Sequence, residues 1–185
     1  MFCYEVVFIN KNASAWQVAG FLFTSVVGTL LHFLFDWAGQ NIVAGLFSAV
    51  NESIWEHMKL IFFPMFIFAL LQYRFWGKDV PGFWCVKLAG IGLALLLIPM
   101  LYYTYTGALG VSADWFNVAI FFIAAGAAFW LETRLFARKR SCRIPSAVAF
   151  ALLCLTALTF VVLTFFPPHI PLFQDPITGT YGYQD

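Results

Sequence analysis

The chain has 185 residues, of which 62% are hydrophobic, 20% aromatic and only 10% charged. A soluble globular domain carries about 45–50% apolar and about 25% charged residues, so this composition excludes a soluble protein. A net charge of +1 without a basic face also excludes a nucleic-acid binder, and a protein that crosses the lipid bilayer several times remains.

Five segments are long and apolar enough to cross a bilayer, which takes about 20 residues of helix. They are residues 15–36, 52–73, 83–105, 115–136 and 145–166. Pro64 and Pro99 lie inside the second and third segments, where we expect them to kink the helices. The sequence therefore predicts an all-α integral membrane protein, a bundle of five transmembrane helices, with residues 1–166 as its single domain.

The connection between the first two predicted helices is unusually apolar. Residues 42–50 carry no charge, yet this stretch is too short to span a bilayer. A plain surface loop would be more polar. We therefore predict a short re-entrant or interfacial segment between these helices.

Lysine and arginine positions predict the orientation, because cytoplasmic loops carry an excess of both. With five spans, every basic residue except Lys59 falls on one side of the membrane: Lys11, Arg74, Lys78, Lys87, Arg134, Arg138, Lys139, Arg140 and Arg143. We expect the N-terminus in the cytoplasm and the C-terminus outside. Glu132, at the cytoplasmic end of the fourth span, is expected to pair with Arg134 or Arg138.

Ionisable residues gather where the first span ends and the second begins, on the side predicted to be outside. His32 and Asp36 are four residues apart and share one helix face, and Glu52 and Glu56 have the same spacing. His57 follows directly. Because polar residues inside a bilayer are costly and mark function by default, these five residues predict a polar site.

The charge of this cluster favours a bound cation. Asp36, Glu52 and Glu56 supply three negative charges and Lys59 one positive charge, which leaves −2 with neutral histidines. A buried charge of −2 is costly unless carboxylates take protons or a cation binds. A divalent metal, zinc before others, balances the count, and a small organic cation or a proton relay fits it as well.

We expect His32, Asp36 and His57 to be metal ligands and Glu56 to be a general base, supported by Glu52, Lys59, Asn51, Ser53 and His169. The metal would activate water for hydrolysis of a lipid-like substrate. The alternatives are a carrier or binding protein for a cation or small solute, and a structural partner subunit with a salt-bridge core. The sequence leaves the oligomeric state open.

These residues also have structural explanations. Ser53 and Glu56 have the spacing of a capping box, and Glu52 suits a helix N-terminus. Asp36 fits a solvated helix end, and Lys59 can pair with Glu56 or extend toward the interface. Both interpretations predict a helix that starts near residue 53.

Residues 167–185 form a separate C-terminal tail whose prolines and glycines prevent a helix. Turn signals occur at Asp175-Pro176 and Thr178-Gly179. The tail also carries apolar side chains, and we expect it to fold over the outer mouth of the bundle. His169 or Asp175 would then reach the polar site.

Three blocks carry a family resemblance: HFLFDWAGQN at residues 32–41, FSAVNESIWEH at 47–57 and HIPLFQDPITG at 169–179. They resemble a family of small bacterial polytopic membrane proteins that is catalogued as a domain of unknown function. The resemblance covers nearly the whole chain. It implies a protein of the bacterial cytoplasmic membrane, in contact with lipid, and brings no established activity with it.

Overall fold

The computed structural model describes residues 2–137 and 144–184. It contains α1 (Phe2–Trp37), α2 (Ile42–Gly45), α3 (Ile54–Phe75), the 3-10 turn η1 (Gly77–Asp79), α4 (Phe83–Leu109), α5 (Asp114–Ala137) and α6 (Ser146–Phe165). Within these residues the only β-type pairing is one isolated bridge, between Gln174 and Tyr181. The all-α prediction is confirmed.

Five helices are long and apolar enough to cross a membrane: Ser14–Trp37, Ile54–Phe75, Phe83–Leu109, Asp114–Ala137 and Ser146–Phe165. The bundle of five membrane helices is therefore confirmed, with ends within four residues of the expected ones. Pro64 and Pro99 lie inside α3 and α4, and both helices continue through them. The connection between the first two spans holds only the four-residue helix α2.

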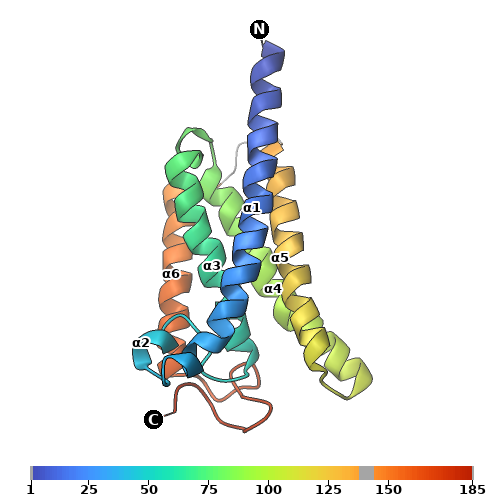
Figure 1. Ribbon diagram of the computed structural model, residues 1–185, viewed down its shortest axis with the longest axis vertical. Helices are drawn as coiled ribbons and strands as arrows, with labels where there is room; N and C mark the ends of the chain where they lie inside the picture. The colour runs from blue at the N-terminus through green and yellow to red at the C-terminus, as the bar shows by residue number, and fades with distance from the viewer. Residues whose placement is uncertain (1, 138–143, 185) are drawn as a thin grey trace.

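The helices stand side by side, with α1 packed against α3 and α5, and α4 packed against α3, α5 and α6 (Figure 1). The chain direction alternates from one long helix to the next. The end of α1, the connection through α2 and the beginning of α3 therefore meet at one end of the bundle. The C-terminal tail lies at this same end (Figure 1).

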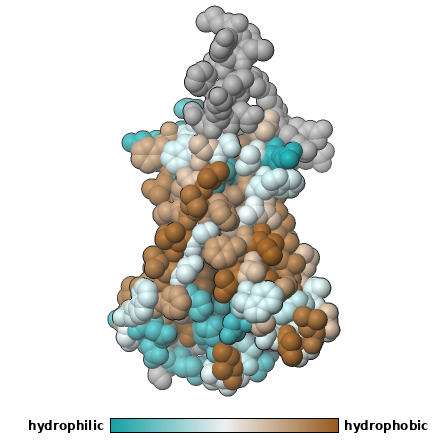
Figure 2. All heavy atoms as spheres, turned by 45° about the vertical axis from the view of Figure 1, so that its right-hand side comes forward, coloured by the Kyte–Doolittle hydropathy of each residue, from teal (hydrophilic) through white to brown (hydrophobic). Residues whose placement is uncertain are grey.

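The surface matches a membrane protein. Hydrophobic residues cover the middle of the molecule, and hydrophilic residues gather at the end that carries the tail (Figure 2). Leucines and valines point outward along α1 and α6, for example Val26 at 60% and Leu158 at 58% exposure. Such side chains are stable when they face lipid, so the long helices place this protein in contact with the bilayer.

Close contacts between helices depend on small residues. A Cβ atom added to Gly20 of α1 would lie 2.5 Å from the Phe129 ring of α5 and 2.7 Å from the Phe68 ring of α3. A Cβ atom on Gly90 of α4 would lie 2.4 Å from the Glu132 side chain. Glycine lets these helices approach, as is common in membrane bundles.

A buried ion pair joins α4 to α5. Lys87 Nζ lies 2.6 Å from Glu132 Oε2, and each side chain is at most 1% exposed. Glu132 therefore pairs with Lys87 and not, as expected, with Arg134, and Arg138, the other expected partner, lies outside the described residues. Helix geometry turns Glu132 into the bundle, whereas Arg134 is exposed and lies over the Trp130 ring. Arg138, Lys139, Arg140 and Arg143 of the predicted cytoplasmic loop lie outside the described residues.

Removing one member of this pair should destabilise the bundle. Lys87→Met or Glu132→Leu alone leaves an uncompensated buried charge, which costs about 3–5 kcal/mol. The double variant removes both charges and should recover most of that loss. Thermal unfolding in detergent measures the three variants, with Arg134→Gln as the exposed control. Single variants that unfold at the wild-type temperature would contradict this assignment.

Candidate metal site

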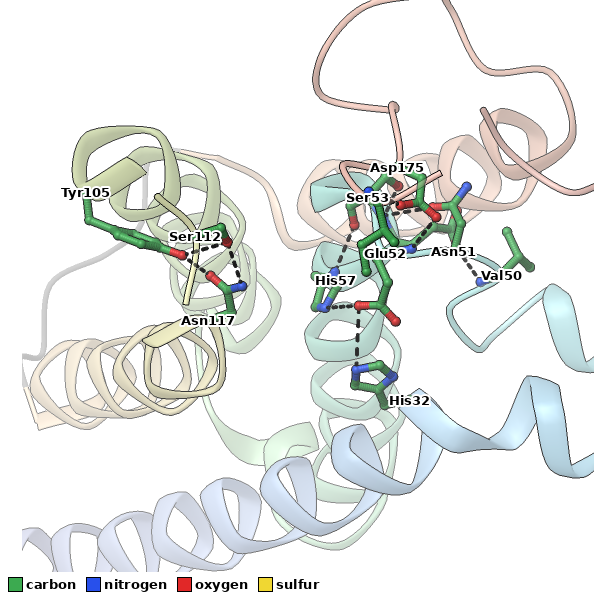
Figure 3. Close-up of polar contacts among 12 residues, drawn as sticks. His32, Val50, Asn51, Glu52, Ser53, His57, Tyr105, Ser112, Asn117 and Asp175 are labelled. Carbon is green, nitrogen blue, oxygen red and sulfur yellow. Dashed lines mark hydrogen bonds and ion pairs between the residues drawn. The ribbon is translucent and has the colours of Figure 1, made fainter. Parts of the chain in front are cut away.

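Three of the ionisable side chains at the tail end of the bundle converge (Figure 3). His57 Nε2 lies 3.5 Å from Glu52 Oε2, and His32 Nε2 lies 4.0 Å from the same oxygen. The two imidazole rings meet edge to face at 5.4 Å between centroids. One donor atom from each residue lies within 4.8 Å of the other two, so this group could hold a metal ion.

The tautomer of His57 leaves Nε2 free to bind. Its Nδ1 lies 2.9 Å from the carbonyl oxygen of Ser53, one turn earlier in the chain. A carbonyl only accepts hydrogen bonds, so Nδ1 carries the proton and donates it there. Neutral His57 then points the lone pair of Nε2 at the Glu52 carboxylate. Two facing acceptors repel each other, and a proton or a metal cation between them removes this repulsion.

The start of α3 fixes the position of His57. Ser53 is the N-cap, and its hydroxyl accepts a hydrogen bond of 3.3 Å from the Glu56 N–H. The Trp55 N–H donates to the Leu172 carbonyl of the tail at 3.0 Å. Because the first N–H groups of a helix lack partners within it, these contacts stabilise the helix end that carries the site.

Glu56 and Lys59 form a second buried ion pair below the histidines. Lys59 Nζ lies 2.6 Å from Glu56 Oε2 and donates to the Gly45 carbonyl at 2.8 Å and to Thr164 Oγ1 at 2.9 Å. Glu56 Oε2 also accepts from the Val50 N–H at 3.2 Å. This network joins α3 to α6 and to the connection between α1 and α3.

Asp175 organises the tail beside Glu52. Its carboxylate accepts hydrogen bonds from the N–H groups of Ile177 at 2.7 Å, Thr178 at 3.2 Å and Glu52 at 3.5 Å. Burial by itself raises the pKa of Asp175, but these donors and the Thr178 hydroxyl outweigh it and hold the pKa below its ordinary value. The ionised carboxylate therefore favours the folded tail.

Gly182 allows the tail to reach the bundle. It has φ +61°, and an added Cβ atom would lie 2.6 Å from the carbonyl oxygen of Thr164. Its own carbonyl accepts from Asn51 Nδ2 at 3.1 Å, and the next N–H, of Tyr183, donates to Thr164 at 2.9 Å. Only glycine combines this conformation with such a close approach.

A pocket with a volume of about 240 Å³ opens beside Glu52 and His57. Its walls come from α3, α4, α5 and the tail: Glu52, Ile54, His57, Ile98, Tyr102, Ser112, Asp114, Asn117, Ile120, Pro176 and Ile177. The far wall is held by the buried Tyr105, whose hydroxyl donates to Asn117 Oδ1 and lies 3.1 Å from Ser112 Oγ (Figure 3). The histidine group thus faces a pocket of mixed polarity.

The structure places the other predicted site residues around this group. Asp36 is exposed and, among the described residues, has no basic group within 4.0 Å. His169 is also exposed and packs against Tyr181 at 4.6 Å between centroids. Asn51 turns its amide oxygen to the Ser53 N–H at 3.0 Å. Of the predicted ligands, the geometry brings together His32 and His57, and it adds Glu52.

Sequence reasoning missed the far wall of the pocket. Ser112 and Tyr105 lie near the turn between α4 and α5, which reads as an ordinary interfacial turn. Asp114 and Asn117 are three residues apart at the start of a span, and this spacing on one helix face is the signal that points to a shared wall.

The donor set fits zinc. Tetrahedral zinc with ligand bonds of about 2.1 Å brings its donor atoms to about 3.4 Å from each other. The separation of 3.5 Å between His57 and Glu52 already matches, and that between His32 and Glu52, 4.0 Å, needs a side-chain shift of about half an ångström. Two histidines and one carboxylate are a donor set of catalytic zinc sites, in which a further position stays open.

The model of a family of unknown function, DUF6512, matches residues 7–183. No curated protein matches the chain, and no solved structure matches it.

Asp175 should make the docking of the tail sensitive to acid. Because its folded pKa lies below the unfolded value, its stabilisation is complete above about pH 4 and is lost as the pH falls through the folded pKa. The protection of residues 171–183 against hydrogen exchange, relative to the intrinsic exchange rate at each pH, should fall in that range. In Asp175→Asn this protection should be low already at neutral pH, whereas Asp79→Asn, at the other end of the bundle, should behave as wild type. Unchanged exchange in Asp175→Asn would refute this role.

Proposed function

We propose that this chain, which belongs to the DUF6512 family of unknown function, binds one divalent cation, zinc before others, through His32, Glu52 and His57. The observation that carries the proposal is the convergence of two imidazole nitrogens and one carboxylate oxygen within 4.8 Å. The hydrogen bond from His57 Nδ1 to Ser53 supports it, because metal-bound histidines usually donate their other ring N–H to a backbone carbonyl or a carboxylate.

The charge around the pocket supports a cation as well. Glu52 and Asp114 line it, and no lysine or arginine is among its described lining residues. Lys59, seven residues beyond Glu52, pairs with Glu56 and does not line the pocket. A divalent cation would neutralise the two carboxylates.

We propose that the bound metal serves hydrolysis of a lipid-like substrate. Three protein ligands leave a position for water, and zinc lowers the pKa of that water to about 7. The pocket offers the reacting group a place beside the metal, and its isoleucines offer the substrate an apolar surface. Glu56 is better suited to hold α3 in place than to act as a base, since its carboxylate is engaged by Lys59, Thr164 and Val50.

The proposed location is the cytoplasmic membrane of a bacterium, with the N-terminus inside. The excess of lysine and arginine at the opposite end of the bundle supports it. The metal site and the tail would then face outward. If the purified protein binds no metal, a carrier or a structural subunit becomes the favoured function.

Metal content of the purified protein tests the proposal. We expect about one zinc per chain by mass spectrometry, and at least a tenfold weaker affinity in His32→Ala, His57→Ala and Glu52→Gln, because each loses a ligand. Asp36→Asn should retain the metal, because Asp36 is a ligand in the sequence prediction but lies outside the group that converges in the structure.

The third histidine of the chain provides the matched control. His169→Ala removes an imidazole from the same end of the bundle without touching the group. Size-exclusion chromatography reports whether each variant stays folded. The proposal fails when folded wild-type protein holds no stoichiometric metal after incubation with zinc, or when the three ligand variants retain it.

A further inference from the structure

We infer that the pocket binds the zwitterionic headgroup of a membrane amphiphile, with an anionic oxygen at the His32, Glu52 and His57 end and an ammonium group at the Asp114 end. The inference rests on the proposed function in one respect, the divalent cation at the first end. It goes further by naming the chemical class of the ligand and the residues that select it.

The pocket has two polar ends. Glu52 lies just before α3 and His57 lies in its first turn (Figure 3). Ser112, Asp114 and Asn117 come from the start of α5 and the turn before it. The second end is rigid, because Asn117 Nδ2 donates to Ser112 Oγ at 3.2 Å and both residues contact the buried Tyr105 hydroxyl. The carboxylate of Asp114 lies next to this set without an ion-pair partner among the described residues.

The charges at the two ends require a ligand that is neutral overall. Glu52 and Asp114 contribute −2, and a divalent cation at the histidine end brings the sum to zero. The distribution is still uneven: the metal and Glu52 together carry +1 at one end, and Asp114 carries −1 at the other. A zwitterion compensates both ends at once, whereas an anionic ligand leaves Asp114 unpaired. Tyr102 also lines the pocket, and an aromatic ring attracts an ammonium group placed over its face.

The size of the pocket indicates a headgroup with its chains outside. Sites for whole small molecules have volumes of about 300–1,000 Å³, and this pocket has about 240 Å³. Apolar side chains continue from it to the surface: Ile177 of the tail is 79% exposed and Trp115, next to Asp114, is 72% exposed. Acyl chains of a bound amphiphile can follow these side chains into the bilayer.

Native mass spectrometry of the zinc-loaded chain in detergent tests the inference. The probes are phosphatidylethanolamine and phosphatidylglycerol with identical acyl chains, which share the phosphate and differ in the ammonium group. We expect phosphatidylethanolamine to bind at least tenfold more tightly. Soluble phosphoethanolamine, which has both charges and no chains, should compete only weakly.

Asp114→Asn is the decisive variant, since it removes the charge that selects the ammonium group and leaves the metal ligands intact. It should keep its zinc and lose the preference for phosphatidylethanolamine. Asp79→Asn, an equally exposed aspartate at the opposite end of the bundle, should keep both. Zinc content and size-exclusion behaviour are measured on the same samples.

The results separate the two proposals. Wild-type protein that holds zinc but binds both lipids equally, or a preference that persists in Asp114→Asn, overturns the headgroup inference and leaves the metal site standing. Phosphoethanolamine that binds as tightly as the lipid overturns the assignment to an amphiphile. Wild-type protein without zinc removes the proposed function and with it the anionic end of the ligand.

Discussion

The ion pair between Glu56 and Lys59 holds the functional end of the molecule together. It lies where α3, α6 and the connection through α2 meet, and Thr164, Gly45 and Val50 supply its remaining hydrogen bonds. Two buried charges are stable in a bundle only when both are paired and hydrogen-bonded. Because Glu56 precedes His57 on the first turn of α3, this network also sets where the imidazole and Glu52 can lie. The candidate metal site of His32, Glu52 and His57 thus lies on top of a buried polar network.

A second set of buried polar side chains lies in the other half of the bundle, apart from the network of Glu56 and Lys59. Gly20 of α1 packs against Phe68 of α3 and Phe129 of α5. Three polar residues lie one helical turn from these, toward the N-terminal end of α1: Gln17, Gln72 and Glu132. Both amide groups and Glu132 Oε1 are buried and have no hydrogen-bond partner in the part of the chain that the structure describes. The aromatic layer around Gly20 lies between them and the histidines. This arrangement suits a site open at one end better than a continuous polar path.

Composition and segment length were enough to predict five membrane helices, and spacing was enough to place His32 and His57 together. Spacing cannot tell which face of a helix end turns inward, and this is why Asp36 reads as a ligand although it is exposed. The partner of Glu132 was missed because Lys87 lies on another helix, 45 residues away, whereas the arginines are close in sequence. Glu52 lies just before α3, where the tail fixes the backbone, and no local pattern encodes that contact.

The contacts between the tail and the start of α3 determine when this end of the molecule can form during synthesis. Asp175 and Gly182 lie 123 and 131 residues after Glu52 and Asn51, the residues just before α3 that they contact. When α3 enters the membrane, the ribosome has not yet made these partners, and the first turn with His57 lacks part of its final support. Three more helices must be inserted before the tail can dock. The proposed metal site would therefore be completed late, after translation of the bundle, and loading with metal would follow membrane insertion.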